Sequence, residues 1–274
     1  MRSPTPNVLS IAGSDPSGGA GIQADLKAFS ALGAYGCAVI TALTAQSTRG
    51  VTGVHVVPAA FVEEQLETLL ADVRIDALKI GMIANAEIAR AIARVLRTHR
   101  PANIVLDPVM VAKGGDRLLA EDAVAAVREE LLPLADVVTP NLPEAGELLG
   151  ATPPTDESGM TAAAEALVGL GAKAVLMKGG HLEGSRSNDL LLCGGSVIRF
   201  EAERIDTKNT HGTGCTLSAA IAALLAQSGS VEEAVRRAKV YITGAIAHAD
   251  ELDVGSGHGP THHFHEMWKR GDIQ

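Results

Sequence analysis

Short apolar runs of strand length alternate with longer stretches of helical periodicity along almost the whole chain. The predicted strands cover Val8–Ala12, Cys37–Ala45, Val54–Val57, Ala77–Met82, Asn103–Leu106, Val137–Thr139 and Ala174–Met177, followed by a hairpin of Leu190–Leu192 with Val197–Phe200. The predicted helices cover Ile22–Leu32, Pro58–Val73, a stretch capped by Asn85 and ending near Thr98, Glu121–Leu132, Thr161–Leu170, Thr213–Gln227 and Val231–Asp250. This alternation predicts an α/β fold, with a mainly parallel central sheet flanked by helices on both faces. No repeat or linker divides the chain, so we expect one domain over residues 1–274.

The charge and cysteine content exclude several classes of function. The formal net charge is −9 and no basic run occurs, which argues against nucleic acid or an anionic membrane as a partner. The three cysteines, Cys37, Cys193 and Cys215, lack CxxC spacing, which argues against a disulfide framework and a cysteine zinc site. Residues 1–7 contain no long apolar segment and no later apolar run is long enough to span a bilayer. We therefore expect a cytoplasmic protein.

The most informative local motif is a glycine-rich loop, His211-Gly212-Thr213-Gly214-Cys215, before an alanine-rich helix. The glycines allow a ligand to approach the backbone, and the helix directs its free amides and its positive dipole end at the loop, which predicts an anion hole. The alternative is an ordinary helix start with Thr213 as the N-cap. Cys215 is either a reactive thiol in the first turn or a small buried residue. A phosphatase loop would need Arg six residues after it, where the chain has Ile221.

Other polar residues follow predicted strands, where ligands bind in parallel sheets. Lys178 could reach a nucleotide phosphate, or it could be a solvated lysine at a strand end. Asn141 and Glu144 could hold Mg²⁺ through water, and they also fit a helix capping box. Asp107 could serve the metal or orient phosphate, or it could form a turn before Pro108.

Two nucleotide-binding motifs and a histidine-rich tail can be tested directly. Walker A is absent, and Gly19–Ala24 matches GxGxxA but the following strand carries no acidic residue for a ribose. That loop is therefore expected to lie over a substrate. The run His262-His263-Phe264-His265 is expected to be exposed or locally packed, and no metal is assigned to it.

Taken together, the motifs resemble those of the hydroxymethylpyrimidine/phosphomethylpyrimidine kinases of thiamine biosynthesis. The matching segments span nearly the whole chain in the same order: Ser14–Lys27, Thr41–Thr48, Lys79–Met82, Leu106–Met110, Thr139–Glu144, Met177–His181, His211–Cys215 and Gly259–His265. The resemblance implies a ribokinase-like fold, usually a homodimer. It implies a transferase that uses ATP to phosphorylate 4-amino-5-hydroxymethyl-2-methylpyrimidine, and then uses a second ATP to convert the monophosphate to the diphosphate.

The resemblance also implies roles for individual residues. Gln46 would be the main pyrimidine contact, since an amide offers a donor and an acceptor together. The other implied substrate positions are Gly13, Asp25, Met82 and Val109, and the implied ATP positions are Asp107, Lys178 and Thr213. Residues Gly212, Thr213, Gly214 and Cys215 would form the catalytic anion hole. Asn141 and Glu144 would hold Mg²⁺ through water, and a monovalent cation is a further candidate cofactor.

Cys215 departs from the wider ribokinase-like superfamily, where an aspartate usually ends this loop as the general base. The thiol could accept the hydroxyl proton, or only its backbone amide could act. Two alternatives to the pyrimidine kinase are a pyridoxal-type vitamin kinase and a non-catalytic vitamin sensor that kept the pocket.

Overall fold

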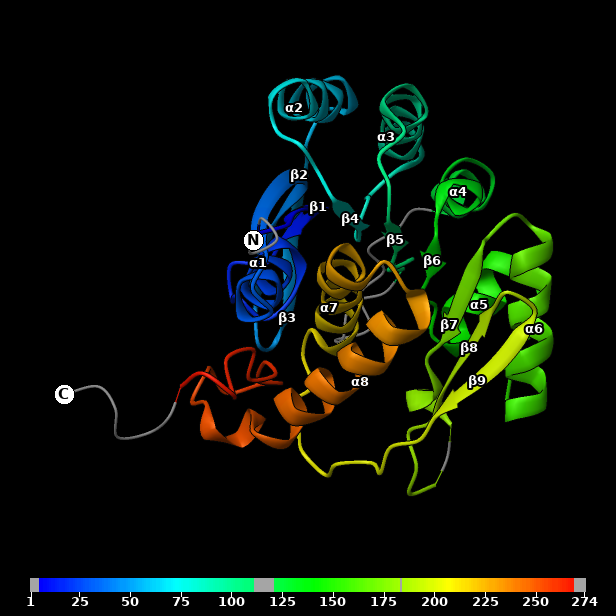
Figure 1. The fold of residues 1–274 in the computed structure, drawn as a ribbon. Coiled ribbons are helices and arrows are strands. Elements are labelled where there is room, and N and C mark those ends of the chain that lie inside the picture. Colours follow the sequence, from blue (N-terminus) through cyan, green and yellow to red (C-terminus); the bar gives the residue numbers. More distant parts are fainter. Residues whose placement is uncertain (1–4, 111–120, 183, 269–274) are drawn as a thin grey trace.

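The computed structural model describes residues 5–110, 121–182 and 184–268, which form a nine-stranded sheet with helices on both faces (Figure 1). The strand order is β3-β2-β1-β4-β5-β6-β7-β8-β9. The strands are β1 (Asn7–Ser14), β2 (Tyr35–Ser47), β3 (Gly50–Val56), β4 (Ala77–Ile80), β5 (Ile104–Leu106), β6 (Val137–Val138), β7 (Ala174–Met177), β8 (Asp189–Cys193) and β9 (Ser196–Phe200). The six central strands, β2, β1, β4, β5, β6 and β7, pair in parallel. Strand β3 at one edge and strands β8 and β9 at the other pair antiparallel. The predicted mainly parallel α/β sheet is confirmed.

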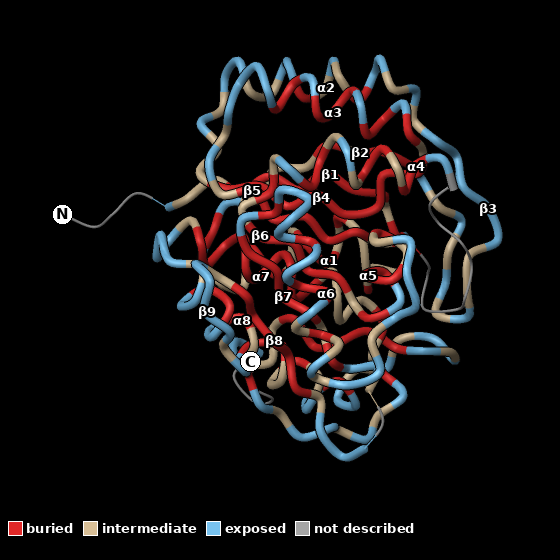
Figure 2. The backbone as a smooth tube through the Cα atoms, turned by 90° about the vertical axis from the view of Figure 1, so that its right-hand side faces the viewer, coloured by how far each residue is buried: buried red, intermediate tan, exposed pale blue. Residues whose placement is uncertain are grey.

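Helices cover both faces of this sheet and divide the core in two. The helices are α1 (Gly21–Ala31), α2 (Ala59–Asp72), α3 (Ala86–His99), α4 (Glu121–Ala126), α5 (Leu142–Leu149), α6 (Glu157–Gly169), α7 (Thr213–Ser228) and α8 (Val231–Ala247). One core lies between the sheet and helices α2 to α6, and the other lies between the sheet and α1, α7 and α8. Buried residues therefore concentrate along the sheet and the inner helix faces (Figure 2). Among the described residues, no helix is both long and apolar enough to cross a membrane.

Helix α7 sits between the sheet and α8, and its sequence reflects that position (Figure 1). Every residue from Thr216 to Leu225 is buried. A helix that is apolar on all sides is stable only when covered on all sides. Alanine at many of these positions allows close packing against the sheet, which holds the helix start rigidly at the carboxyl ends of the strands.

The element bounds differ from the sequence prediction at several places. Strand β2 continues to Ser47 and forms an antiparallel pair with β3, which begins at Gly50 rather than at Val54, so Gln46 lies within a paired strand. Helix α6 begins at Glu157 because the Asp156 side chain accepts a hydrogen bond from the Gly159 amide.

Two further helices end earlier than predicted. Helix α4 ends at Ala126. A short π-helix, η1 (Val127–Leu131), and a short 3₁₀-helix, η2 (Leu132–Leu134), follow it. Pro133 has no amide hydrogen to continue the α-helical ladder there. Helix α8 ends at Ala247, not Asp250, and the 3₁₀-turn η4 (Ala249–Glu251) follows it.

Candidate active site

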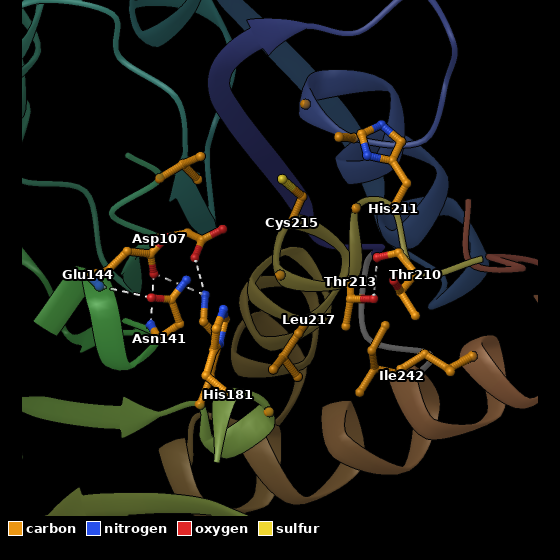
Figure 3. Close-up of a pocket in the computed structure, with 18 of the residues that line it drawn as sticks. Asp107, Asn141, Glu144, His181, Thr210, His211, Thr213, Cys215, Leu217 and Ile242 are labelled. Carbon is orange, nitrogen blue, oxygen red and sulfur yellow. Dashed lines mark hydrogen bonds and ion pairs between the residues drawn. The ribbon is translucent and has the colours of Figure 1, made fainter. Parts of the chain in front are cut away.

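A cavity of about 650 Å³ lies at the carboxyl ends of the parallel strands, between the loop after β1, the end of β2, and the start of α7 (Figure 3). One part of its wall comes from the N-terminal half of the chain: Gly13, Ser14, Asp15, Thr44, Gln46, Met82 and Val109. The other part comes from later elements: Asn141, Glu144, Lys178, Thr213, Leu217, Ile242, Thr243 and Ile246. The residues from Thr210 to Cys215 lie between the two parts.

The glycine-rich loop takes the form expected of an anion hole, with one correction. The N-cap of α7 is Gly212, with φ of 76°, and not Thr213. A Cβ at Gly212 would overlap the carbonyl oxygen of Gly19, so glycine is required both for the dihedral angle and for the close approach. Thr213 is the first helical residue, and its hydroxyl donates to the Thr210 carbonyl oxygen at 2.8 Å. No side chain caps this helix start; the Thr213 amide donates to the Thr210 carbonyl oxygen at 3.3 Å, and Gly214 and Cys215 follow it on the cavity lining.

Lys178 follows β7 but is not a solvated lysine, because two carboxylates surround it. Its Nζ lies 2.9 Å from Asp107 Oδ1 and 3.6 Å from Glu144 Oε2. Burial alone would lower the pKa of Lys178, but the charges of Asp107 and Glu144 raise it above its usual range. Burial alone would raise the pKa of Asp107, whereas the Lys178 and Lys79 charges together with hydrogen bonds lower it. The pair is therefore ionised and borders the cavity.

Asn141 and Glu144 form a complete capping box at the start of α5. The Asn141 side chain accepts from the Glu144 amide at 2.9 Å, and Glu144 Oε2 accepts from the Asn141 amide at 2.7 Å. Burial, followed by the Asp107 charge, raises the pKa of Glu144 to about 7, even though Lys178 acts in the opposite direction.

The same two side chains fit a metal ion that keeps most of its water. Within the described ranges, no group of three or more His, Cys, Asp or Glu residues is placed to hold a metal directly. A carboxylate and an amide beside a cavity are instead suited to Mg²⁺, which loses its water reluctantly.

The predicted substrate positions do not all lie on the cavity wall. Gln46, Gly13, Met82 and Val109 line the cavity, but Asp25 does not. Asp25 is on the buried face of α1, with both carboxylate oxygens 2.9 Å from Lys79 Nζ, and it accepts a hydrogen bond from Ser10 Oγ at 2.6 Å. Asp25 as a substrate position stays a prediction: in this structure its side chain lies off the cavity wall and is bonded to Lys79 and Ser10.

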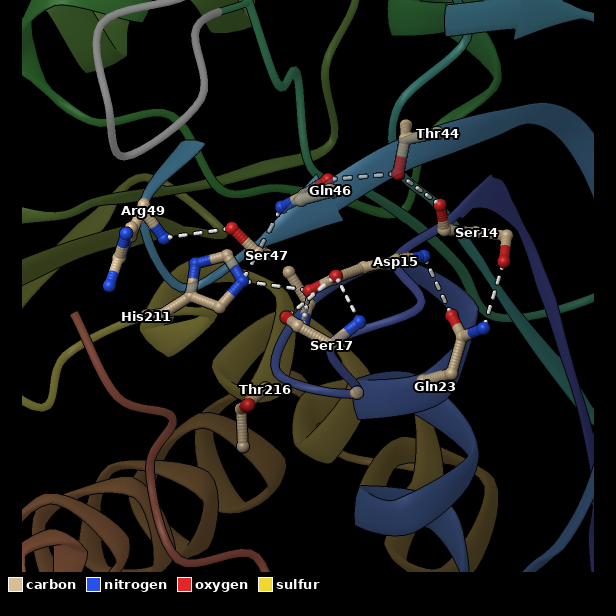
Figure 4. Close-up of polar contacts among 12 residues, drawn as sticks. Ser14, Asp15, Ser17, Gln23, Thr44, Gln46, Ser47, Arg49, His211 and Thr216 are labelled. Atoms are coloured by element: carbon tan, nitrogen blue, oxygen red, sulfur yellow. Dashed lines mark hydrogen bonds and ion pairs between the residues drawn. The ribbon is translucent and has the colours of Figure 1, made fainter. Parts of the chain in front are cut away.

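Sequence reasoning missed Asp15 and His211 as a pair. His211 Nε2 lies 2.7 Å from Asp15 Oδ2, and both side chains are buried (Figure 4). Asp15 also accepts from the Ser17 amide and hydroxyl and from the Ala20 amide, so it binds the loop after β1 to the glycine-rich loop. An aspartate followed by Pro-Ser-Gly-Gly does indicate a side-chain-closed turn, but nothing local to the sequence indicates the histidine, 196 positions away.

Burial is the largest influence on the pKa values of Cys215 and His263. Burial raises the pKa of the Cys215 thiol to about 11, although the Lys79 charge opposes this shift. The thiol is therefore protonated at neutral pH. His263 is buried and pairs with Thr216 Oγ1 at 3.0 Å, and burial lowers its pKa to about 3. The histidine-rich tail is thus locally packed.

The chain resembles known kinases over almost its full length. The model of the phosphomethylpyrimidine kinase family matches residues 15–262. The hydroxymethylpyrimidine/phosphomethylpyrimidine kinase of Salmonella typhimurium is 55% identical over 96% of this chain and 98% of its own length. The Clostridium difficile phosphomethylpyrimidine kinase structure has a TM-score of 0.79 and 42% identity, over 88% of this chain and all of that chain.

A related vitamin kinase has a similar fold. The structure of an ADP complex of Bacillus subtilis pyridoxal kinase has a TM-score of 0.87 and 38% identity, and covers 94% of this chain and 97% of that one. These neighbours confirm the predicted ribokinase-like fold. From the family match and the identity across its length, this chain belongs to the phosphomethylpyrimidine kinase family.

Proposed function

We propose that this protein transfers the γ-phosphoryl group of ATP to 4-amino-5-hydroxymethyl-2-methylpyrimidine, and then phosphorylates the monophosphate with a second ATP. The observation that carries the proposal is the position of the α7 start. Its first residues, Thr213, Gly214 and Cys215, line the same cavity as Gln46, Lys178 and Asp107. A hydroxyl and a phosphate bound to the two parts of the cavity wall would therefore meet at an anion hole.

In each step, the substrate oxygen forms a bond to the γ-phosphorus and the bond to the bridging oxygen of ADP breaks. In the first step the attacking hydroxyl also loses its proton to water, whereas in the second step the attacking phosphate oxygen is already ionised. The amides of Gly212, Gly214 and Cys215 stabilise the charge that develops on the transferred group, and Thr213 holds the loop in place through its bonds to the Thr210 carbonyl oxygen. Lys178 supplies a positive charge on the ATP side, held by Asp107. Mg²⁺, held through water by Asn141 and Glu144, would neutralise phosphate charge.

Substrate recognition is assigned to the other wall. Gln46 offers a donor and an acceptor to the ring, and Gly13, Met82 and Val109 shape the space around it. A Cβ at Gly13 would lie 2.8 Å from Met82 Sδ, so glycine at this position leaves room for the Met82 side chain. Asp25 acts on this wall only indirectly, through Lys79.

The test is a kinase assay with purified protein, ATP and Mg²⁺. The two phosphorylated pyrimidines are separated by chromatography and identified by mass spectrometry. We expect the monophosphate to appear first and the diphosphate after it. Absence of both products would overturn the proposal, and tight pyrimidine binding without turnover would indicate a sensor.

Pyridoxine is assayed alongside because a pyridoxal kinase shares the fold. A higher kcat/KM on pyridoxine would reassign the substrate. Omitting K⁺ tests the monovalent-cation requirement.

We also propose a cytoplasmic homodimer that uses the β3 edge of the sheet. Large apolar side chains are exposed on neighbouring elements there: Leu43 of β2, Val54 of β3 and Phe61 of α2. A second copy would remove these side chains from water. Light scattering of Leu43→Lys/Val54→Lys should give half the wild-type mass. An unchanged mass, or a wild type that is already monomeric, would contradict the dimer.

A further inference from the structure

A row of polar side chains connects the loop after β1 with the glycine-rich loop by way of Gln46 (Figure 4). Thr44 Oγ1 lies 2.8 Å from the Ser14 carbonyl oxygen and 3.1 Å from Gln46 Oε1. Gln46 Nε2 lies 3.5 Å from His211 Nε2, which lies 2.7 Å from Asp15 Oδ2. Gln46 is thus in contact on both sides before any ligand arrives.

The hydrogen on His211 Nε2 is fixed by Asp15. An ionised carboxylate only accepts hydrogen bonds, so the ring nitrogen 2.7 Å away must donate. The side chains of this pair are 9% and 3% exposed, so water cannot replace either partner at low cost. Asp15 cannot swing away, because Ser17 and Ala20 also bind its two oxygens. The single hydrogen on His211 Nε2 points chiefly at Asp15, so the same N–H edge faces Gln46 as the longer arm of a three-centre hydrogen bond and still favours an acceptor there over a second donor.

A donor at His211 conflicts with the Gln46 amide as it stands. Gln46 Nε2 carries two hydrogens, so two donors face each other across 3.5 Å. The opposite side has the complementary conflict. Thr44 has one hydroxyl hydrogen, and the Ser14 carbonyl oxygen competes with Gln46 Oε1 for it. Turning the Gln46 amide over by rotation about its last torsion resolves both conflicts, since Oε1 then faces the His211 N–H edge and Nε2 donates to Thr44 Oγ1.

We propose that His211, held as a donor by Asp15, is a positioning residue that selects one orientation of the Gln46 amide and so determines how the substrate ring is accepted. This inference rests on the proposed function. An aminopyrimidine edge has an acceptor beside a donor, and it pairs with a fixed amide one way round only. An amide free to rotate presents both orders, of which one turns the hydroxymethyl group away from the glycine-rich loop.

The test is a double-mutant cycle between His211 and Gln46. Calorimetry without ATP measures the Kd of the hydroxymethylpyrimidine for wild type, His211→Leu, Gln46→Ala and the double variant. His211→Leu should raise Kd by about 10-fold, as expected when a buried acceptor loses its donor. In the Gln46→Ala background the same change should add less than about 2-fold, because its effect passes through Gln46. His211→Gln, whose amide nitrogen can replace Nε2 as the donor, should recover most of the affinity.

Other readouts separate positioning from a general structural role. The KM for ATP should stay within about 2-fold in His211→Leu, and the pyrimidine KM should change more than kcat. If His211→Leu weakens pyrimidine binding as much in the Gln46→Ala background as alone, or does not weaken it at all, the inference fails. Circular dichroism monitors folding. If His211→Leu does not fold, the double-mutant cycle is repeated with Thr44→Val, which removes the contact on the other side of the Gln46 amide. The same criterion then decides the question. A wild type without kinase turnover contradicts the proposed function, whereas a wild type with turnover and an additive cycle contradicts only this inference.

Discussion

Two lysine–aspartate pairs lie near Cys215, and both have an Nζ–carboxylate distance of 2.9 Å. Lys79 and Asp25 are both 0% exposed. Lys178 is 14% exposed and borders the cavity, with its partner Asp107 at 1%. The distance is the same, and Lys79 also lines the cavity, but of these two lysines only Lys178 keeps an exposed surface.

The remaining partners of the two lysines explain this difference. Asp25 binds Lys79 with both oxygens, and Ser10 completes the carboxylate, so the pair is closed. Lys178 instead has Glu144 at 3.6 Å, so two carboxylates share one ammonium group. That excess of negative charge favours a cation beside it, and the lysine can exchange a carboxylate for a phosphate. In this protein, the buried ion pair that indicates ligand binding is therefore the one in which carboxylates outnumber ammonium groups.

The closed pair should show the larger effect on stability. We expect Lys79→Met to lower the free energy of unfolding by about 3–5 kcal/mol, because Asp25 is left buried without its counter-charge. Urea unfolding followed by circular dichroism measures the change. In the matched control, Lys79→Met/Asp25→Leu, removal of both charges should recover most of the loss. If the single variant is as stable as wild type, Lys79 is not the counter-charge that Asp25 requires.

The open pair should show the larger effect on turnover. We expect Lys178→Met to lower kcat by about 10²–10³-fold, comparable to removing one donor from an anion hole. Its loss of stability should be smaller than that of Lys79→Met, since Lys178 borders the cavity. Steady-state kinetics with ATP and the pyrimidine, together with the same urea titration, separate the two effects. A Lys178→Met enzyme with near wild-type kcat would show that both pairs are structural.

The sequence predicted the open pair but not the closed one, for a physical reason. Lys178 and Asp107 both follow apolar strands, and parallel strands bring their carboxyl ends to one edge of the sheet. Asn141 and Glu144 were likewise recognisable by their spacing in a capping box, which the structure confirms. Asp25, in contrast, lies within a helix, and the pairing that buries it joins residues 54 positions apart. Helical periodicity identifies the inner face of α1, but it does not reveal a lysine in β4 opposite that face.

The apolar part of the wall was also beyond sequence reasoning. Leu217, Ile242 and Ile246 line the cavity from α7 and α8. Their spacing is the same as that of residues that only pack in the core, so periodicity alone cannot separate the two uses. The packing of α8 against α7 decides which of them face the cavity.

The shared carboxylate of the open pair should make metal use depend on pH. With a Glu144 pKa of about 7, the carboxylate is mostly protonated at pH 6, and a protonated carboxyl is a poor metal partner. Between pH 7.5 and pH 6, the Mg²⁺ concentration for half-maximal rate should rise about eightfold, the ratio of the ionised fractions for that pKa. Glu144→Gln should need more Mg²⁺ at both pH values and show little change between them. An equal pH response in wild type and variant would exclude Glu144 as its source.

The same shift has a consequence for stability, with a defined sign. The folded protein holds the Glu144 proton up to about pH 7, whereas the unfolded chain releases it near the ordinary value of 4.5. Between these values the unfolded state binds fewer protons, so the stability of the ligand-free protein should fall as pH rises. Urea midpoints of wild type and Glu144→Gln across pH 5–8 measure this contribution. It should be absent in the variant.

Cys215 should respond least, although it ends the glycine-rich loop. Both lysine–aspartate pairs act on its thiol, and Lys79 lowers its pKa whereas Asp107 and Asp25 raise it. Burial is the largest influence and raises the pKa to about 11, so at neutral pH roughly one thiol in 10⁴ is ionised. A base present in that proportion contributes little, whereas the backbone amide needs no ionisation.

We therefore expect Cys215→Ser to change kcat by less than about fivefold, since transfer depends chiefly on positioning and charge stabilisation. Single-turnover kinetics isolate the chemical step, and Cys37→Ser is the matched control for a thiol outside the cavity wall. A 100-fold loss confined to Cys215→Ser would assign the proton to the sulfur, and would require a bound cation to lower the pKa of the thiol.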